Sequence, residues 1–285
     1  MPTRRALVTG GAGFIGSHLC EHLLGEGWEV TVVDDLSTGS RENLAALEGK
    51  PGFRLEVGLA GDRDLVERLA DRADAIFHLA AVVGVRKVME DTVHTIEKNL
   101  HTTEVILKAA SRRKLRTVIT STSEVYGSNR KDAFREDDDS VIGSSRHRRW
   151  CYAAGKLLDE FPAYAYWHSD ALPVTLARLF NTVGPRQVGH YGMVVPTFVG
   201  QALRGEPITV YGDGSQRRCF AYVQDTVRCL AALAGCEAAA GRTFNIGSTT
   251  ETSIMELAGK VKALTGSGSE IVTKSYSEVY GEDFV

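Results

Sequence analysis

The stretch Leu7-Val8-Thr9-Gly10-Gly11-Ala12-Gly13-Phe14-Ile15-Gly16 determines the fold class of this chain. An apolar run, Ala6–Thr9, leads into its glycines, and a helix-length segment, Phe14–Gly25, follows them. The glycines fit the spacing Gly11-x-Gly13-x-x-Gly16 and the related spacing Gly10-x-x-Gly13-x-x-Gly16. Such glycines allow a tight turn and a close approach of the backbone to a pyrophosphate. The order of strand, glycine turn and helix predicts a dinucleotide-binding turn, with the helix N-terminus facing the phosphates.

Short apolar runs alternate with helix-length segments through the first 180 residues. Continuous runs rich in Val, Ile and Leu are typical of strands covered on both faces. The further expected strands are Val30–Asp34, Phe53–Val57, Ala75–Leu79, Thr117–Ser121 and Val174–Phe180. The further expected helices are Asp62–Ala70, Thr92–Ser111 and Trp150–Ser169. The alternation predicts an α/β fold with a doubly wound parallel sheet of the Rossmann type.

The pattern of the sequence changes after Asn181, where shorter expected elements are separated by Gly and Pro. We therefore expect a dinucleotide-binding domain over residues 1–180 and a smaller substrate-binding lobe over residues 181–285. The elements are expected to interleave, with residues 223–245 returning to the first domain.

The composition excludes several classes of protein. Among 285 residues, 33 Lys and Arg stand against 36 Asp and Glu, a balance that argues against a protein that coats nucleic acid or a membrane surface. No apolar run approaches the length of a membrane span, and the N-terminus enters the first strand without a signal-peptide core. The five cysteines form no CxxC pair, so we expect no disulfide framework, no metal site and a cytoplasmic location.

An acidic residue at the end of the second expected strand indicates which dinucleotide binds. Asp34 follows Gly16 by 18 residues, close to the usual spacing of about 20. A carboxylate there accepts a hydrogen bond from the ribose 2′-hydroxyl of NAD and repels the 2′-phosphate of NADP. Asp34 therefore favours NAD and argues against an NADP-linked reductase.

A phenol and an ammonium share one face of a later expected helix. Tyr152 and Lys156 have the spacing i, i+4. A free phenol has a pKa of about 10, and a neighbouring cation lowers it toward neutrality. Alone, this pattern also fits a surface tyrosine with a solvated lysine. The hydroxyl-rich end of a strand supplies the context: Thr122 can bind a substrate hydroxyl, and Glu124 is the carboxylate best placed to join the chemistry, or else an exposed loop residue.

With these motifs the chain resembles the extended short-chain dehydrogenase/reductase superfamily, and within it the NAD-dependent nucleotide-sugar epimerases, dehydratases and decarboxylases. The motifs that carry the resemblance are Thr9–Gly16, Asp34–Gly39, His78–Ala81, Asn99, Thr122–Gly127, Tyr152 with Lys156, Arg178–Arg186, Val210–Arg218 and Phe244–Gly247. Thr122-Ser123-Glu124 is most similar to UDP-glucuronic acid decarboxylases, and Trp150 and Tyr280–Phe284 resemble a bacterial branch of them.

The resemblance implies a role for each matching residue. A tightly held and recycled NAD would contact Gly10, Gly13, Phe14, Ile15, Gly16, Asp34, Asp62, Ala80, Asn99, Tyr152 and Lys156. Asp62 would lie near the adenine, and Ala80 near the nicotinamide ribose. A UDP-sugar would contact Thr122, Ser123, Asn181, Arg186 and Arg218. Thr122, Glu124, Tyr152 and Lys156 would be catalytic.

Relatives also form homodimers through the two helices expected at Thr92–Ser111 and Trp150–Ser169. Both segments carry apolar residues at helical spacing. Packing against the sheet explains part of that pattern, and a homodimer is expected to explain the rest.

Three reactions share oxidation of the sugar C4 as a first step: decarboxylation of a uronic acid, 4-epimerisation and 4,6-dehydration. Dehydratases of the family carry Asp where this chain has Ser123, so dehydration ranks third, and Thr122-Ser123-Glu124 favours decarboxylation over epimerisation. A protein that keeps the fold but only binds ligands is disfavoured by the intact Thr122, Tyr152 and Lys156.

A uronate carboxylate needs a cation as its partner. Arg86, Lys87 and the basic run Arg146–Arg149 are candidates, and the basic run also fits a solvated loop, as does the acidic run Arg135–Asp139. Relatives continue past the Tyr280-Gly281 segment with a basic stretch that helps close the site, and this sequence ends at Val285 within that region.

Overall fold

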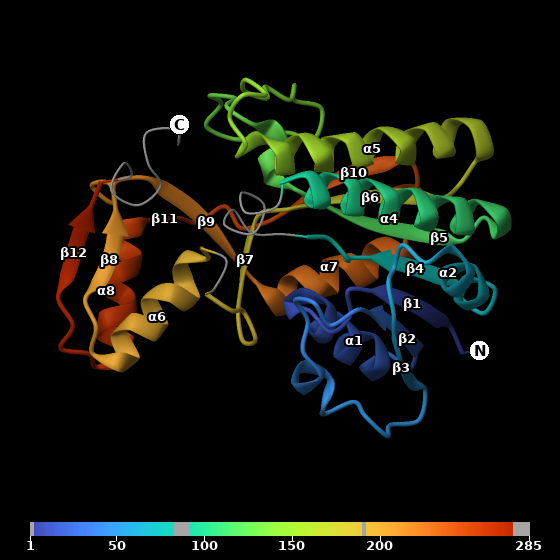
Figure 1. Ribbon diagram of the computed structural model, residues 1–285, viewed down its shortest axis with the longest axis horizontal. Coiled ribbons are helices and arrows are strands. Elements are labelled where there is room, and N and C mark those ends of the chain that lie inside the picture. The colour runs from blue at the N-terminus through green and yellow to red at the C-terminus, as the bar shows by residue number, and fades with distance from the viewer. Residues whose placement is uncertain (1–2, 83–91, 190–191, 276–285) are drawn as a thin grey trace.

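A computed structural model describes residues 3–82, 92–189 and 192–275 of the chain (Figure 1). Its main sheet has seven strands in the order β10-β6-β5-β4-β1-β2-β3, and every neighbouring pair is parallel. The strands are β1 (Arg5–Thr9), β2 (Glu29–Asp34), β3 (Phe53–Val57), β4 (Ala75–His78), β5 (Arg116–Thr122), β6 (Val174–Leu179) and β10 (Arg242–Ile246). The predicted doubly wound parallel sheet is therefore confirmed.

Helices cover both faces of this sheet, which explains why the central strands β1 and β4 are buried over almost their whole length (Figure 1). One face packs α1 (Phe14–Gly25) and α7 (Val223–Gly235), and the other packs α2 (Arg63–Ala70), α4 (Thr92–Arg113) and α5 (Trp150–Asp170). Strand β1 shows the alternation: Ala6 and Val8 belong to the first core, and Leu7 between them belongs to the second. Three 3₁₀ turns, Arg41–Leu44, Ser123–Tyr126 and Glu237–Ala239, complete this part of the described chain.

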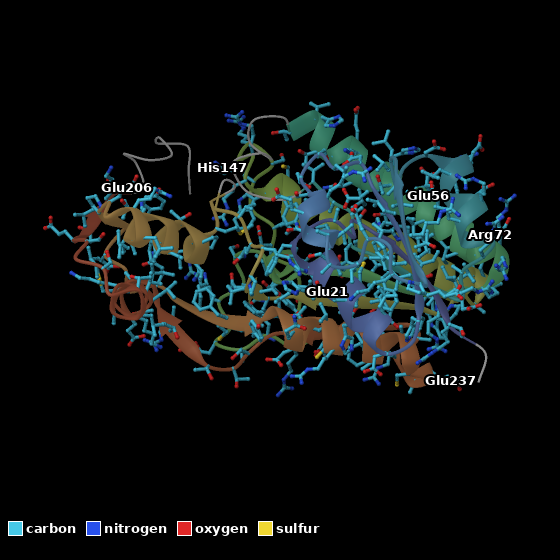
Figure 2. All side chains as sticks on the ribbon, turned by 90° about the horizontal axis from the view of Figure 1, so that it is seen from below. Glu21, Glu56, Arg72, His147, Glu206 and Glu237 are labelled. Atoms are coloured by element: carbon cyan, nitrogen blue, oxygen red, sulfur yellow. The ribbon has the colours of Figure 1, made fainter. Side chains whose placement is uncertain are left out.

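A smaller lobe with its own apolar core lies at one end of the sheet (Figure 1). It contains β7 (Asn181–Val183), β9 (Arg217–Tyr222) and β11 (Glu251–Ser253) in one sheet, and β8 (Ile208–Tyr211) with β12 (Ile271–Lys274) in another. Helices α6 (Val194–Arg204) and α8 (Ile254–Thr265) pack against each other and against β8. In Figure 2, Glu206 marks the outer end of this lobe, and Glu56 and Arg72 lie toward the opposite end of the molecule.

The chain leaves the smaller lobe once before its end. Helix α7 packs beside α1, and β10 pairs with β6 at the edge of the main sheet. The division into a domain of residues 1–180 and a lobe of residues 181–285 remains a prediction.

His78 joins three elements where β4 ends. Its Nδ1 lies 2.8 Å from the Thr9 hydroxyl of β1, and its Nε2 lies 3.2 Å from the Thr103 hydroxyl of α4. The ring is buried, and this burial, with a smaller contribution from the charge of Lys156, lowers the pKa of His78 to about 3. The folded protein therefore holds a neutral imidazole at a pH where an unfolded histidine, with a pKa near 6.5, takes up a proton.

This difference predicts how stability depends on pH. Because the pKa of His78 is depressed on folding, its contribution is fully present above pH 6.5 and is lost as the pH falls toward 3. The loss can reach about 1.4 kcal/mol of unfolding free energy for each pH unit in that window. Urea unfolding measures the free energy of unfolding at pH 7 and at pH 4.5. Between these two pH values it should decrease less for His78→Gln than for the wild type. The exposed His168 supplies the control, since His168→Gln should follow the wild type. Equal decreases in all three proteins would contradict the prediction.

Candidate active site

A cavity of about 860 Å³ opens where the strands of the main sheet end and faces the smaller lobe. Its wall includes the glycine turn after β1, the ends of β2, β4 and β5, the start of α5, and residues of β8, β9 and α6. The carboxyl ends of parallel strands meet at one edge of a sheet, so motifs far apart in the sequence converge there. The volume is within the range of small-molecule sites.

The glycine turn has the geometry of a phosphate cradle. Gly10 has φ +73°, and a Cβ there would lie 2.7 Å from the backbone N of Ala80. A Cβ on Gly16 would lie 2.1 Å from the carbonyl oxygen of Gly10. Helix α1 begins after Gly13, which provides no side-chain cap, so the first-turn N–H groups can bind an anion. The predicted residues Gly10, Gly13, Phe14, Ile15 and Gly16 all line the cavity.

Gly11 serves a different purpose from the other glycines of the motif. A Cβ there would lie 2.6 Å from both methyl carbons of the Val32 side chain. Its smallness lets the turn pack on β2. Of the two glycine spacings in the sequence, the one through Gly10, Gly13 and Gly16 is therefore the one that faces the cavity.

Asp34 is held in a fixed orientation at the cavity wall. Its two carboxylate oxygens accept hydrogen bonds from the backbone N–H groups of Ala12, at 2.9 Å, and Leu36, at 2.8 Å. Burial raises the pKa of Asp34, and these two donors oppose that shift. Next to it, Lys98 of α4 pairs with Asp35 at 2.7 Å. Although burial works against it, hydrogen bonds from Lys98 and Ser37 hold the pKa of Asp35 at about 2.

Tyr152 and Lys156 lie together on the cavity wall, on the first turns of α5. Lys156 Nζ donates to Asp159 Oδ2 at 3.1 Å, and both side chains are buried. Burial, followed by the charges of Glu124 and Asp159, raises the pKa of Tyr152 above that of a free phenol. The protein alone therefore holds Tyr152 protonated. A cation that entered the cavity would lower this pKa.

Thr122, Ser123 and Glu124 lie beside α5, where β5 ends and a 3₁₀ turn begins. Thr122 Oγ1 accepts the backbone N–H of Glu124 at 3.2 Å, which starts the 3₁₀ turn and leaves the hydroxyl proton available to donate. Burial raises the pKa of Glu124, and the charge of Arg149 opposes this shift. All three residues line the cavity, as does Arg149.

Two more predicted cofactor residues lie on the wall, and one does not. Ala80 is on the wall, and Asn99 binds the backbone of Val82 through both ends of its amide, at 2.7 and 3.2 Å. Asp62 is not among the described residues that line the cavity, although Ala60 is. The Asp62 side chain is exposed and accepts the Leu65 N–H, which caps α2. The structure therefore gives Asp62 a capping role, and the predicted contact with adenine stays untested.

The predicted substrate residues Asn181, Arg186 and Arg218 also line the cavity. Asn181 Nδ2 donates to the carbonyl of Cys219 at 3.2 Å, and the Arg218 side chain donates to the carbonyl of Arg217 at 2.7 Å. Arg186 instead reaches α1, where it donates to Ser17 at 3.2 Å and pairs with Glu21 at 2.5 Å. Its guanidinium thus has partners within the chain, and a role in substrate binding stays a prediction.

Residues 6–247 match the NAD dependent epimerase/dehydratase family. The chain belongs to that family.

Relatives within the epimerase/dehydratase family include two decarboxylases. The UDP-N-acetyl-alpha-D-glucosaminuronate decarboxylase of Bacillus cytotoxicus is 42% identical over 282 residues, which are 99% of this chain and 86% of the relative. The UDP-glucuronic acid decarboxylase 1 of Xenopus tropicalis is 40% identical over 268 residues, 94% of this chain. The match covers only 62% of that longer relative.

Solved structures of the family share the fold. The UDP-glucuronic acid 4-epimerase of Bacillus cereus, in complex with UDP-glucuronic acid and NAD, has a TM-score of 0.86 and 30% identity over 95% of this chain and 86% of that structure. The dTDP-glucose 4,6-dehydratase DesIV of Streptomyces venezuelae has a TM-score of 0.85 and 33% identity over 95% of this chain and 84% of that structure.

Two residues of the site were not predicted from the sequence. Lys98 precedes the recognised Asn99 and pairs with the second aspartate of the Asp34-Asp35 motif. Asp159 follows Lys156 by three residues, a helical spacing that signals contact. One oxygen of Asp159, Oδ1, is buried without a hydrogen-bond partner.

Some predictions fall outside the described residues. Arg86, Lys87 and Tyr280–Phe284 lie there. Among the residues that are described, no group of three or more His, Cys, Asp or Glu side chains is placed to hold a metal ion. Within the same ranges, no helix is long and apolar enough to span a bilayer.

The position of Asp34 predicts the cofactor preference of the site. Asp34→Asn keeps one of the two oxygens that accept backbone N–H groups and removes the charge, so NAD should bind about 10-fold or more weakly while NADP binding improves. Titration calorimetry on cofactor-stripped protein measures both affinities. Asp74→Asn, at the opposite end of the same sheet, should leave both unchanged. Equal affinity of the wild type for NAD and NADP would refute the ribose assignment.

Proposed function

We propose that this chain binds NAD and a UDP-uronic acid, oxidises the sugar at C4 and releases C6 as CO₂. The observation that carries the proposal is the convergence of Thr122, Glu124 and Tyr152 on one cavity that also holds the glycine turn and Asp34. Ser123 stands where dehydratases carry Asp, so no acid is present there to expel a C6 oxygen. The two decarboxylases that match nearly the whole chain support the same reaction.

In the first step Thr122 donates a hydrogen bond to the C4 oxygen, and Tyr152, once ionised, takes the C4 hydroxyl proton. Lys156, held by Asp159, stabilises the phenolate by its charge. When bound, NAD accepts a hydride from C4 and later returns it, so it is recycled. The product of this step is a 4-keto uronic acid, which is a β-keto acid.

The second step breaks the C5–C6 bond. Its electron pair enters the C4–C5 bond to give an enolate on the C4 oxygen, and CO₂ leaves. Thr122 and protonated Tyr152 can stabilise this oxygen by hydrogen bonds. A proton then returns to C5. Because burial raises the pKa of Glu124, this side chain can carry a proton near the reacting carbons, which suits it to protonate C5.

The alternative is 4-epimerisation, in which the 4-keto sugar turns over and is reduced on its other face. The similarity to a UDP-glucuronic acid 4-epimerase keeps this reaction in view. The named decarboxylases also differ in substrate, one acting on a 2-acetamido uronate and one on glucuronate. The choice between these two sugars is left to experiment.

One assay separates the reactions. Incubation with UDP-glucuronic acid or with its 2-acetamido analogue should release CO₂ from at least one of them and yield a UDP-pentose or its 4-keto form. Tyr152→Phe lacks the base and should lower the rate about 10²–10⁴-fold. CO₂ is followed directly, and the sugar nucleotides are resolved by chromatography. A C4-epimerised uronate without CO₂ would show the epimerase instead, and UDP-galactose from UDP-glucose would show a hexose epimerase.

We also propose that the chain forms a homodimer through α4 and α5, which lie side by side (Figure 1). Both helices expose apolar side chains: Val93, Ile96, Leu100, Leu158 and Phe161. Val93 is 67% exposed and Phe161 is 65% exposed, so burying this surface against a second copy is favourable. We also propose a cytoplasmic location, as expected from the sequence.

Changing this surface should change the mass in solution. We expect a dimer by light scattering at micromolar concentration for the wild type and a monomer for Leu158→Asp/Phe161→Asp. The control is Leu203→Asp/Leu264→Asp, which places the same charges on two exposed leucines of the smaller lobe and should stay dimeric. A monomeric wild type would rule the dimer out.

A further inference from the structure

Five basic side chains of the described residues line the cavity: Lys98, Arg149, Lys156, Arg186 and Arg218. Lys98 and Arg186 pair with Asp35 and Glu21, on the side of β2 and α1. Arg218 belongs to β9 in the smaller lobe. Lys156 and Arg149 are on or next to α5, beside Tyr152. Arg149 is the one of these two that carries a guanidinium, and its position can be related to the chemistry at Tyr152.

Arg149 immediately precedes α5 and already has helical backbone angles, φ −57° and ψ −28°. It is three residues before Tyr152, so the two side chains start from the same face of the helix, about one turn apart. The guanidinium stacks on the Trp150 ring, 4.5 Å from its centroid. Such stacking holds the plane of the guanidinium in one orientation.

The substrate of the proposed function places a carboxylate close to this point. In a uronic acid only C5 separates C4 from the carboxylate carbon C6. When the C4 hydroxyl lies against Tyr152, the carboxylate must therefore lie next to it. Glu124 is on the same part of the wall, where its charge acts on Tyr152. The charge of Arg149 acts on Glu124, so the guanidinium also lies near this part of the wall.

We propose that Arg149 binds the C6 carboxylate of the substrate and selects uronates against neutral hexoses. This inference rests on the proposed function and assigns recognition of the acidic group to Arg149. A guanidinium matches a carboxylate with two parallel hydrogen bonds, which an ammonium cannot do. Of the candidates in the basic run, Arg149 lines the cavity, whereas Arg146 and Arg148 are exposed and are not among the described lining residues.

The position also predicts how Arg149 divides its effect between binding and turnover. A pair with the carboxylate forms in the bound ground state, before CO₂ leaves. As the C5–C6 bond breaks, negative charge moves from the carboxylate to the C4 oxygen, beside Tyr152. Arg149 therefore contributes mainly to substrate affinity and little to the chemical step, because it does not hold the transition state more tightly than the ground state.

The test compares a uronate with its neutral counterpart on the NAD-loaded protein. Arg149→Gln should raise the dissociation constant and KM of UDP-glucuronic acid about 30-fold or more, change kcat much less, and leave the affinity for UDP-glucose within about 3-fold. Arg149→Lys keeps the charge but cannot form two parallel hydrogen bonds. Its dissociation constant for UDP-glucuronic acid should lie between those of the wild type and Arg149→Gln. Arg148→Gln is the matched control and should behave as the wild type. Thermal unfolding and NAD content check that each variant is folded, and Arg149→Lys carries the comparison if Arg149→Gln does not fold.

Two outcomes overturn the inference: an unchanged affinity of Arg149→Gln for UDP-glucuronic acid, or an equal loss of affinity for the acid and for UDP-glucose. Failure of the proposed function is distinguishable, because it appears in the wild type as the absence of CO₂ from both uronates. A wild type that prefers uronates through Arg149 but releases no CO₂ would sustain the carboxylate site and reject the decarboxylase.

Discussion

The buried ion pair between Arg178 of β6 and Glu160 of α5 fixes the helix that carries Tyr152 against the sheet. Arg178 donates to both oxygens of Glu160, at 3.0 and 2.7 Å, and Ser121 of β5 donates to one of them at 2.5 Å. Removing one partner of such a pair leaves a buried charge and costs about 3–5 kcal/mol. The pair therefore holds β5, which ends in Thr122, and α5 in one relative position. The proposed proton transfer between Tyr152 and a hydroxyl bound by Thr122 depends on that position.

Arg178 also contacts residues of the segment that connects β5 to α5. Arg178 donates to the carbonyl of Glu136 at 3.0 Å and lies over the Tyr126 ring, 4.8 Å from its centroid. Tyr126 stacks on Phe134 and donates to Asn245 of β10 at 2.7 Å. The loop between β5 and α5 is thus tied to the edge of the sheet. Arg149, the last residue before α5, lines the cavity, so the contacts that order this loop also help to position that cation.

The sequence predicted the main sheet and the glycine turn because both depend on local patterns. Apolar runs such as Ala75–Leu79 form strands where helices cover both faces, as the buried strand β4 does, and Phe14–Gly25 begins and ends as the glycines dictate. Asp62 caps its own helix through the Leu65 N–H, a local contact that an Asp at the start of an expected helix favours. The contact of Arg186 was not predictable in this way, because it meets Glu21, which is more than 160 residues away in the chain. The partner of such a side chain is decided by packing between distant elements, and no local spacing encodes it.

The electrostatics of the cavity bear on the order of events in the proposed reaction. Burial and the carboxylates of Glu124 and Asp159 raise the pKa of Tyr152, so the phenol keeps its proton while the cavity holds only the chain's own charges. Lys156 cannot offset this alone, because Asp159 lies 3.1 Å from it. The positive charge of an oxidised nicotinamide beside Tyr152 would lower this pKa. In the proposed reaction Tyr152 would then act as a base only with the hydride acceptor in place, which would couple C4 deprotonation to C4 oxidation.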